Sequence, residues 1–228
     1  MDIIEAVKTT FERMKNKRFF VSEADFQSAL AWELTETFKQ DPTIKVYREF
    51  PIRVFRDKWR TIYIDLVVVK DGKMFPIELK YKTAVVESDA TYENTNIPMR
   101  HILKPHGAQD ENGYDFWKDI SRIEGMIDRG EAERGICIMV SNDKAYWQAK
   151  CREGTQAYAF RLLAGHKARG PYRWNFTRCA NPDKILNVRP HLDILNDYDF
   201  EWVDFCTVPD VPNGLFRCLV VPIPPKKK

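Results

Sequence analysis

The chain has 228 residues, of which 44% are hydrophobic and 30% are charged. This length and composition suit a single domain over 1–228 with a sizeable core, and they exclude global disorder and low-complexity architectures. The net charge is only +3, from 36 Lys and Arg against 33 Asp and Glu. A basic surface for nucleic acid would therefore have to come from local segregation of charge.

Cysteine usage and hydropathy bear on the cellular compartment. No apolar run approaches the length of a membrane span, and the N-terminal residues carry acids early, unlike a signal peptide. The five cysteines are an odd number without a close pair, which argues against a zinc ribbon and against a disulfide framework. These features predict a cytoplasmic protein without a membrane partner.

Two helices and three strands are predicted in the first third of the chain. The pattern favours a short helix over 2–14 and a longer one that begins after Ser22, its N-cap, and ends near Phe38. Strands are expected over 45–54, 61–69 and 73–82. The last two strands flank Asp71-Gly72, a strong signal for a two-residue hairpin turn.

That turn fixes the register of its hairpin. Lys70 lies opposite Lys73, and counting back along both strands places Asp65 opposite Glu78. This position is a non-hydrogen-bonded one, where facing Cβ atoms are about 5 Å apart. Two like charges so close together destabilise a sheet unless a cation lies between them.

The second half of the chain gives weaker signals. Residues 83–113 show no period, which is typical of a functional segment, and a helix is expected over 114–129. A buried strand over 135–140 follows this helix, and a helix followed by a buried strand implies a crossover onto the same sheet. Beyond Asn142 the expected elements are a helix over 143–151, a hairpin from 157–163 and 172–176, and strands over 201–205 and 216–221.

The order helix, three strands, helix, strand predicts an α/β fold. We expect a three-layer α/β/α core with a mixed sheet over 20–142. A mainly β extension over 143–228 is expected to pack on this core.

Three charged residues interrupt the apolar strands. Asp65 lies within TIYIDLVVV, and Glu78 and Lys80 share one face of the next strand because side chains alternate. Ionisable groups inside a sheet are costly unless they are paired or bind a metal. Two carboxylates suit a hard divalent cation, which lowers the pKa of a bound water. An ammonium can stabilise charge that develops on a phosphate. The ordinary alternative is a half-exposed sheet face with a Glu–Lys pair.

Asp65 and Glu78-Leu79-Lys80, in this order of helices and strands, resemble the PD-(D/E)XK nuclease superfamily. Restriction endonucleases, archaeal Holliday-junction resolvases and virus-type replication-repair nucleases belong to it. The resemblance covers about 20–140 and implies a restriction-endonuclease-like fold and Mg²⁺-dependent hydrolysis of phosphodiesters, with Mn²⁺ as a substitute ion. It implies that Asp65, Glu78 and the carbonyl of Leu79 bind the metal and that Lys80 is catalytic.

The resemblance has one departure and one open choice. Ile64 stands where the superfamily name has Pro, and many members lack that Pro. Such families often add an acid from the first helix, and Glu23 is preferred here, with Gln27 one turn on as an accessory residue. Glu33 is the alternative acid. If Glu23 has no role in the site, its carboxylate only interacts with the dipole at the start of the helix, which stabilises the helix by about a few tenths of a kcal/mol.

A second group of residues is a candidate nucleic-acid surface. Arg161, Lys167, Arg169 and Arg173 are interleaved with aromatic residues, a pattern that suits phosphate contacts and base stacking. The alternative is a solvated hairpin whose aromatic side chains lie in the core. Arg122 could reach the metal site, but an ion pair on the surface of its helix is preferred.

The function expected from the sequence is a metal-dependent nuclease acting on DNA, as a homodimer or with a partner subunit if it is not a monomer. The alternative is a non-catalytic nucleic-acid-binding or assembly subunit that keeps the fold. The intact Glu78-x-Lys80 pair favours the enzyme. DNA or RNA, and single-stranded, double-stranded or branched substrates, remain open.

Overall fold

The structure is a computed structural model of residues 1–228. It describes all of them except 56–58, 87–102, 149–152, 169, 178–180 and 227–228. The first part of the chain contains α1 (Ile3–Met14), α2 (Glu23–Phe38), β1 (Ile44–Phe55), β2 (Trp59–Lys70), β3 (Lys73–Lys82), α3 (Gln109–Asp128) and β4 (Gly135–Ser141). The second part contains α4 (Ala145–Gln148), the 3-10 helix η1 (Tyr158–Phe160), β5 (Lys167–Ala168), α5 (Pro182–Val188), β6 (Tyr198–Asp199), β7 (Trp202–Thr207) and β8 (Leu215–Ile223).

Six strands form one mixed sheet in the order β1-β2-β3-β4-β8-β7. The pair β3–β4 is parallel, and the other neighbouring pairs are antiparallel. The chain reaches β4 from β3 by crossing over through α3, as the sequence predicts. The predicted α/β class with a mixed sheet is confirmed. The strands expected over 201–205 and 216–221 are present as β7 and β8, and both belong to this main sheet.

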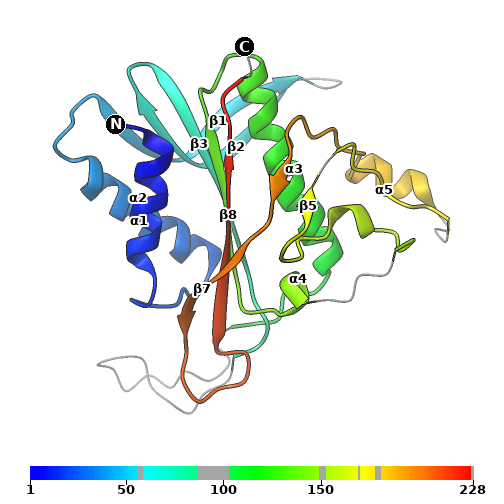
Figure 1. The fold of residues 1–228 in the computed structure, drawn as a ribbon. Coiled ribbons are helices and arrows are strands. Elements are labelled where there is room, and N and C mark those ends of the chain that lie inside the picture. The colour runs from blue at the N-terminus through cyan, green and yellow to red at the C-terminus, as the bar shows by residue number, and fades with distance from the viewer. Residues whose placement is uncertain (56–58, 87–102, 149–152, 169, 178–180, 227–228) are drawn as a thin grey trace.

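Helices cover both faces of the sheet. Helices α1 and α2 pack on one face, where Phe11 and Leu30 meet Leu66 and Ile77. Helix α3 packs on the other face, where Trp117 belongs to a second core (Figure 1). None of the described helices is long and apolar enough to cross a membrane.

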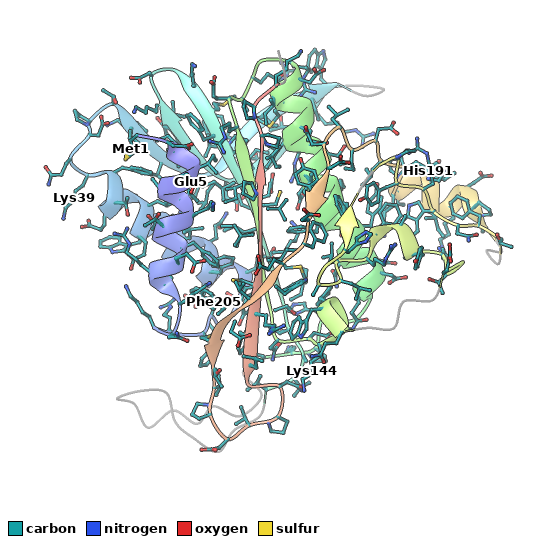
Figure 2. The ribbon with its side chains drawn as sticks, viewed as in Figure 1. Met1, Glu5, Lys39, Lys144, His191 and Phe205 are labelled. Atoms are coloured by element: carbon teal, nitrogen blue, oxygen red, sulfur yellow. The ribbon has the colours of Figure 1, made fainter. Side chains whose placement is uncertain are left out.

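The helix starts have local causes. The carboxylate of Asp2 accepts hydrogen bonds from the first N–H groups of α1, and the hydroxyl of Ser22 accepts one from Asp25 N at the start of α2. Helix α2 begins where the sequence predicts, and α1 begins one residue after its predicted start. The far end of the chain returns to α1, because Phe205 of β7, labelled in Figure 2, stacks on Phe11 with 5.2 Å between ring centroids.

The β2–β3 hairpin has the predicted register near its turn. Asp71 and Gly72 both have positive φ, as a type I′ turn requires. The ladder runs without a shift from Lys70–Lys73 to the fifth pair, Leu66–Ile77. The predicted next pair, Asp65–Glu78, is not part of the ladder, which ends at Leu66–Ile77.

Elsewhere three expectations need correction. Helix α3 begins at Gln109, five residues before the predicted start, and the short α4 covers only part of 143–151, whose last residues lie outside the described chain. The hairpin expected from 157–163 and 172–176 is wrong. Tyr172 instead forms an isolated bridge with Leu192, and β5 pairs with β6. The aromatic side chains there are buried against α3, and this packing determines the path of the chain.

Candidate active site

Glu78 and Lys80 point from β3 towards α3, as strand alternation predicts, and meet oppositely charged groups there. Lys80 Nζ lies 2.5 Å from Asp119 Oδ2, and Glu78 Oε1 lies 2.5 Å from Arg122 Nη2. Arg122 Nη2 also lies 2.5 Å from Asp119 Oδ1. The four side chains form a continuous, largely buried chain of alternating charge between the strand and the helix.

Asp65 reaches the same place from β2. Its Oδ2 accepts a hydrogen bond of 2.7 Å from the backbone N–H of Leu79, the residue between Glu78 and Lys80. Lys80 Nζ donates to the carbonyl of Leu79 at 3.2 Å. Because the Leu79 N–H donates to the Asp65 side chain, it does not donate to a backbone carbonyl of β2 in the ladder. This bond explains why the ladder ends before Asp65 and why the carboxylate lies beside the peptide that joins the two charged residues of β3.

Helix α2 supplies one acid and one amide. Glu23 Oε2 accepts a hydrogen bond of 2.8 Å from Tyr81 N and lies 3.4 Å from Lys82 Nζ. Gln27 lies one turn further on the same side of α2, and its amide nitrogen donates to the carbonyl of Asp65 at 2.8 Å. The N-cap at Ser22 places Glu23 in the first turn, where it faces the strands.

The two candidate helix acids differ in position. Glu23 contacts β3 through Tyr81 and Lys82, whereas Glu33 has no hydrogen bond or ion pair to β2 or β3 within the described part of the chain. The amide of Gln27 also donates to Glu49 Oε1 at 2.6 Å. Glu49 lies on β1 with a left-handed backbone, φ 48°, and is skipped in the ladder beside Asp65. Glu49 of β1 therefore borders the site through Gln27.

Burial dominates the electrostatics of the carboxylates. It raises the pKa of Asp65, with Lys80 and the Leu79 N–H opposing the rise. Burial also raises the pKa of Glu78 well above its usual range, and nearby Asp119 adds to this, while Arg122 opposes it. A bound divalent cation would favour the ionised forms of both carboxylates, because an opposite charge lowers the pKa of an acid.

Lys80 responds in the opposite way. Burial alone lowers the pKa of its ammonium, but the carboxylates of Asp119, Glu78 and Asp65 together outweigh burial and hold that pKa above its usual value. Lys80 is therefore a protonated, positively charged group at neutral pH. It can donate hydrogen bonds and stabilise negative charge, and it is unsuited to removing a proton from water.

The donor set can be tested against a metal ion. Glu78 Oε1 and Asp119 Oδ2 are buried, and their contacts with Arg122 and Lys80 are not oriented as hydrogen bonds. Within the described ranges, no group of three or more His, Cys, Asp or Glu side chains could hold a metal ion. Two carboxylates and the Leu79 carbonyl are hard oxygen donors that fit Mg²⁺, which typically uses one or two carboxylates and fills its other positions with water and phosphate oxygens.

The sequence did not predict Asp119 as a site residue. It predicted that Arg122 would form an ion pair on the surface of its helix, and this prediction is wrong because the ion pair is largely buried. Arg122 does pair with Asp119, but its side chain is only 20% exposed and also contacts Glu78. The available signal was an acid and a base three residues apart on a helix with a broad apolar face. Because α3 lies directly on β3, this pair is internal.

The predicted nucleic-acid residues are not part of this site. The Arg161 guanidinium lies 3.8 Å from the ring centroid of Tyr158. Arg173 donates to Asp193 Oδ1 at 2.6 Å, which neutralises its charge. Arg169 and the side chain of Lys167 lie outside the described residues.

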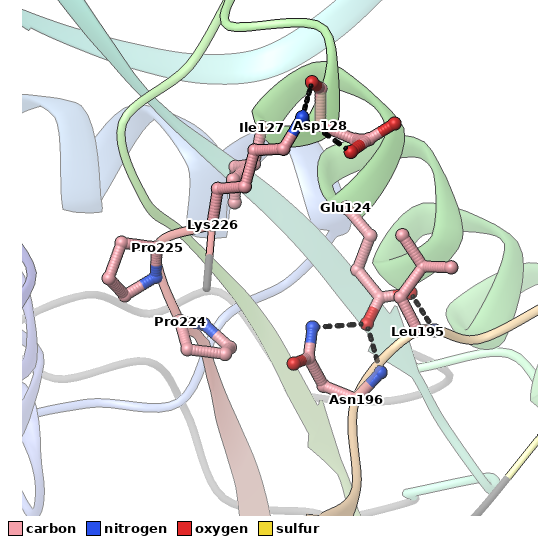
Figure 3. A pocket seen from close by; sticks show the side chains of 8 residues that line it. All are labelled: Glu124, Ile127, Asp128, Leu195, Asn196, Pro224, Pro225 and Lys226. Carbon is pink, nitrogen blue, oxygen red and sulfur yellow. Dashed lines mark hydrogen bonds and ion pairs between the residues drawn. The ribbon is translucent and has the colours of Figure 1, made fainter. Parts of the chain in front are cut away.

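A further buried acid on α3 has a structural role. Glu124 accepts hydrogen bonds from Leu195 N, from the backbone and side chain of Asn196, and from the Tyr198 hydroxyl. Figure 3 shows its carboxylate between α3 and this segment, in a pocket that Pro224 and Pro225 also line. Four donors hydrogen-bond to its carboxylate, so Glu124 holds the segment 195–198 against α3.

Comparison of the chain with models of known families, with curated proteins and with solved structures found no match.

Proposed function

We propose that the protein is a metal-dependent nuclease with a restriction-endonuclease-like core, which hydrolyses phosphodiester bonds in DNA. One observation carries this proposal. Asp65 is hydrogen-bonded to the peptide between Glu78 and Lys80, so two carboxylates, one carbonyl and one ammonium converge at the edge where β2 and β3 separate. An oxygen-rich site beside a fixed positive charge suits a substrate phosphate and its metal ion.

Each side chain has a role in this proposal. Asp65, Glu78 and the carbonyl of Leu79 would hold Mg²⁺ or Mn²⁺, and such an ion supplies an activated water and neutralises phosphate charge. Lys80 is protonated and donates to a phosphate oxygen as negative charge develops there. Asp119 holds the ammonium of Lys80 charged and positioned.

Glu23 and Gln27 support the site from α2. The carboxylate of Glu23 fixes the backbone of β3 just beyond Lys80, at Tyr81 N. The amide of Gln27 fixes the backbone of Asp65. These bonds restrict the relative positions of the two strands that carry the proposed metal ligands.

A second candidate function is a non-catalytic nucleic-acid-binding subunit. The observation that favours it is the contact between Arg122 and Glu78, in which a guanidinium already occupies one oxygen of a proposed metal ligand. In a nuclease this ion pair must loosen when a metal ion binds. In a binding subunit it would simply persist.

One experiment separates the two candidates. Wild-type protein and Lys80→Ala are incubated with end-labelled single-stranded, double-stranded and branched DNA and with RNA, in Mg²⁺, Mn²⁺ or EDTA. The control is Lys73→Ala, which removes an exposed lysine from the same strand. The nuclease proposal requires metal-dependent cleavage that Lys80→Ala loses and Lys73→Ala keeps. Binding without cleavage in every ion would favour the second candidate.

A further inference from the structure

The β1–β2 hairpin extends past the rest of the sheet. Strand β2 pairs with β1 along its whole length, from Phe55–Trp59 to Ile44–Lys70, but with β3 only from Leu66 onwards. Among the described residues, the half of β2 before Asp65 therefore has a single neighbouring strand. In Figure 1 this end of the hairpin projects from the body of the protein. We call residues 50–55 and 59–64 the hairpin arm.

The two faces of the arm differ in burial. Phe50 and Ile52 pack against the core beneath α3. The opposite face contains Pro51, Arg53, Thr61 and Tyr63, because Pro51 faces Tyr63 and Arg53 faces Thr61 across the ladder. These four residues are exposed. The arm therefore has one face anchored on the protein and one face open to solvent.

The exposed face is aromatic. Trp59 is 59% exposed and Tyr63 is 56% exposed, unusually high values for large aromatic side chains. The Arg53 guanidinium lies 5.1 Å from the ring centroid of Trp59, so a planar cation and an aromatic ring already stack here. A surface of this kind can stack further flat rings and contact phosphates at the same time.

Positive charge is concentrated on this hairpin. Its described residues contain five bases, Lys45, Arg48, Arg53, Arg60 and Lys70, and two acids, Glu49 and Asp65. The resulting net charge of +3 equals that of the whole chain, so the remaining residues balance one another. Lys45, Arg48 and Arg53 make no ion pair within the described ranges. By contrast, Arg173 of the sequence-predicted surface is paired with Asp193.

The arm also leads to the proposed metal site. Tyr63 precedes Asp65 by two residues on β2, which is a distance of about 7 Å along a strand. Ile64 belongs to the core beneath α3 and Leu66 to the core beneath α1 and α2, so the alternation of side chains is interrupted at Asp65 and the exposed face of the arm ends beside this residue. The arm therefore adjoins a proposed metal ligand along β2, and its exposed face lies on the side of the sheet away from α3.

We propose that the exposed face of the hairpin arm, through Arg53, Trp59 and Tyr63, binds unpaired nucleotides next to the site. This inference rests on the proposed function for its choice of ligand. Single-stranded nucleic acid is the ligand that fits, because stacking on side chains requires bases with free faces, and Arg53 supplies a phosphate contact. Bases inside a duplex already stack on their neighbours.

The test measures binding in EDTA, so that cleavage plays no part. Fluorescence anisotropy compares an end-labelled single-stranded DNA with the matching duplex. Trp59→Ala combined with Tyr63→Ala should weaken single-strand binding about tenfold or more, since two stacking surfaces are lost. Trp59→Phe with Tyr63→Phe should retain most of the affinity. The matched control is Trp32→Ala, because Trp32 is 69% exposed on α2, outside the hairpin.

The salt dependence of binding tests the charge. Arg53→Gln should reduce the slope of log affinity against log salt by about 0.7, the value for one phosphate contact with a single strand. Arg173→Gln should leave that slope unchanged. Circular dichroism verifies that each variant is folded. Because these side chains are exposed, their substitution is expected to leave the fold intact.

Three outcomes would overturn the inference: wild-type binding to duplex as tight as to the single strand, unchanged affinity in the double Ala variant, or a slope that responds to Arg173→Gln instead of Arg53→Gln. The proposed function fails in a different way, through the absence of cleavage by wild-type protein in Mg²⁺ and Mn²⁺. A protein that binds single strands through the arm but never cleaves them would retain this inference and lose the nuclease proposal.

Discussion

Lys80 of β3 and Asp119 of α3 form an ion pair with 2.5 Å between Nζ and Oδ2, and their side chains are only 16% and 6% exposed. The pair joins the central sheet to the helix that crosses over it. It also couples the stability of the fold to the charge of the proposed catalytic lysine. The Asp119 carboxylate holds α3 on the sheet, and it also keeps Lys80 charged.

Asp119→Asn should destabilise the protein by about 3 kcal/mol, since removal of one partner from a buried ion pair leaves the other charge uncompensated. The measurement is the free energy of unfolding in urea. Glu133→Gln is the control, because it breaks the exposed pair with Lys73 and should cost no more than about 1 kcal/mol. Equal effects of the two substitutions would show that the buried pair is not important for stability.

Glu78 predicts a pH dependence of stability. Burial, with Asp119 adding to it, raises the pKa of Glu78 well above 4.5, its value in an unfolded chain. Between the two pKa values, the folded protein retains a proton on Glu78 that the unfolded chain has lost. The contribution of Glu78 protonation to the free energy of unfolding is therefore complete below pH 4.5, and it disappears as the pH rises through the pKa of the folded protein. Glutamine does not titrate, so the stability of wild type relative to Glu78→Gln should fall as pH rises.

Urea unfolding of both proteins in EDTA, at a series of pH values from 4.5 upward, gives this difference directly. EDTA is required because a bound cation would hold the carboxylate ionised. A difference that stays constant or grows with pH would show that Glu78 is already ionised in the folded protein.

Mg²⁺ should raise the midpoint of thermal unfolding. At about a hundred times its dissociation constant, a ligand that binds only the folded state adds about 2.7 kcal/mol. Asp65→Asn should remove most of this effect while retaining an oxygen that can accept the Leu79 N–H. Asp204→Asn is the control, because Asp204 is an exposed acid on β7. A wild-type midpoint that does not respond to Mg²⁺ would contradict the metal site.

Glu23→Gln and Glu33→Gln separate the two helix acids. Glutamine at position 23 keeps an acceptor for Tyr81 N but loses the charge, so the fold should remain while metal-dependent turnover falls about tenfold, equivalent to about 1.4 kcal/mol of activation free energy. Glu33→Gln should leave turnover unchanged. Calorimetric titration with Mn²⁺ reports whether the charge acts on metal binding, and a loss confined to Glu33→Gln would reverse the assignment.

Local patterns in the sequence determined much of the framework of the site. The Ser22 cap fixed the first turn of α2, and the positive-φ turn at Asp71-Gly72 set the register of the hairpin as far as Leu66–Ile77. Strand alternation put Glu78 and Lys80 on one face. These features depend on neighbours within a few residues, so residue type and spacing are sufficient to predict them.

The tertiary structure decided the partners of those residues. Asp119 and Arg122 lie about forty residues beyond Glu78 and Lys80, and only the packing of α3 on β3 brings them together. Asp65 left its predicted pairing because its carboxylate accepts the Leu79 N–H. Contacts of this kind depend on how separate elements approach one another in space, which the period of one element does not specify. The sequence alone therefore identified the charged residues of the strands, and the fold determined which groups neutralise them.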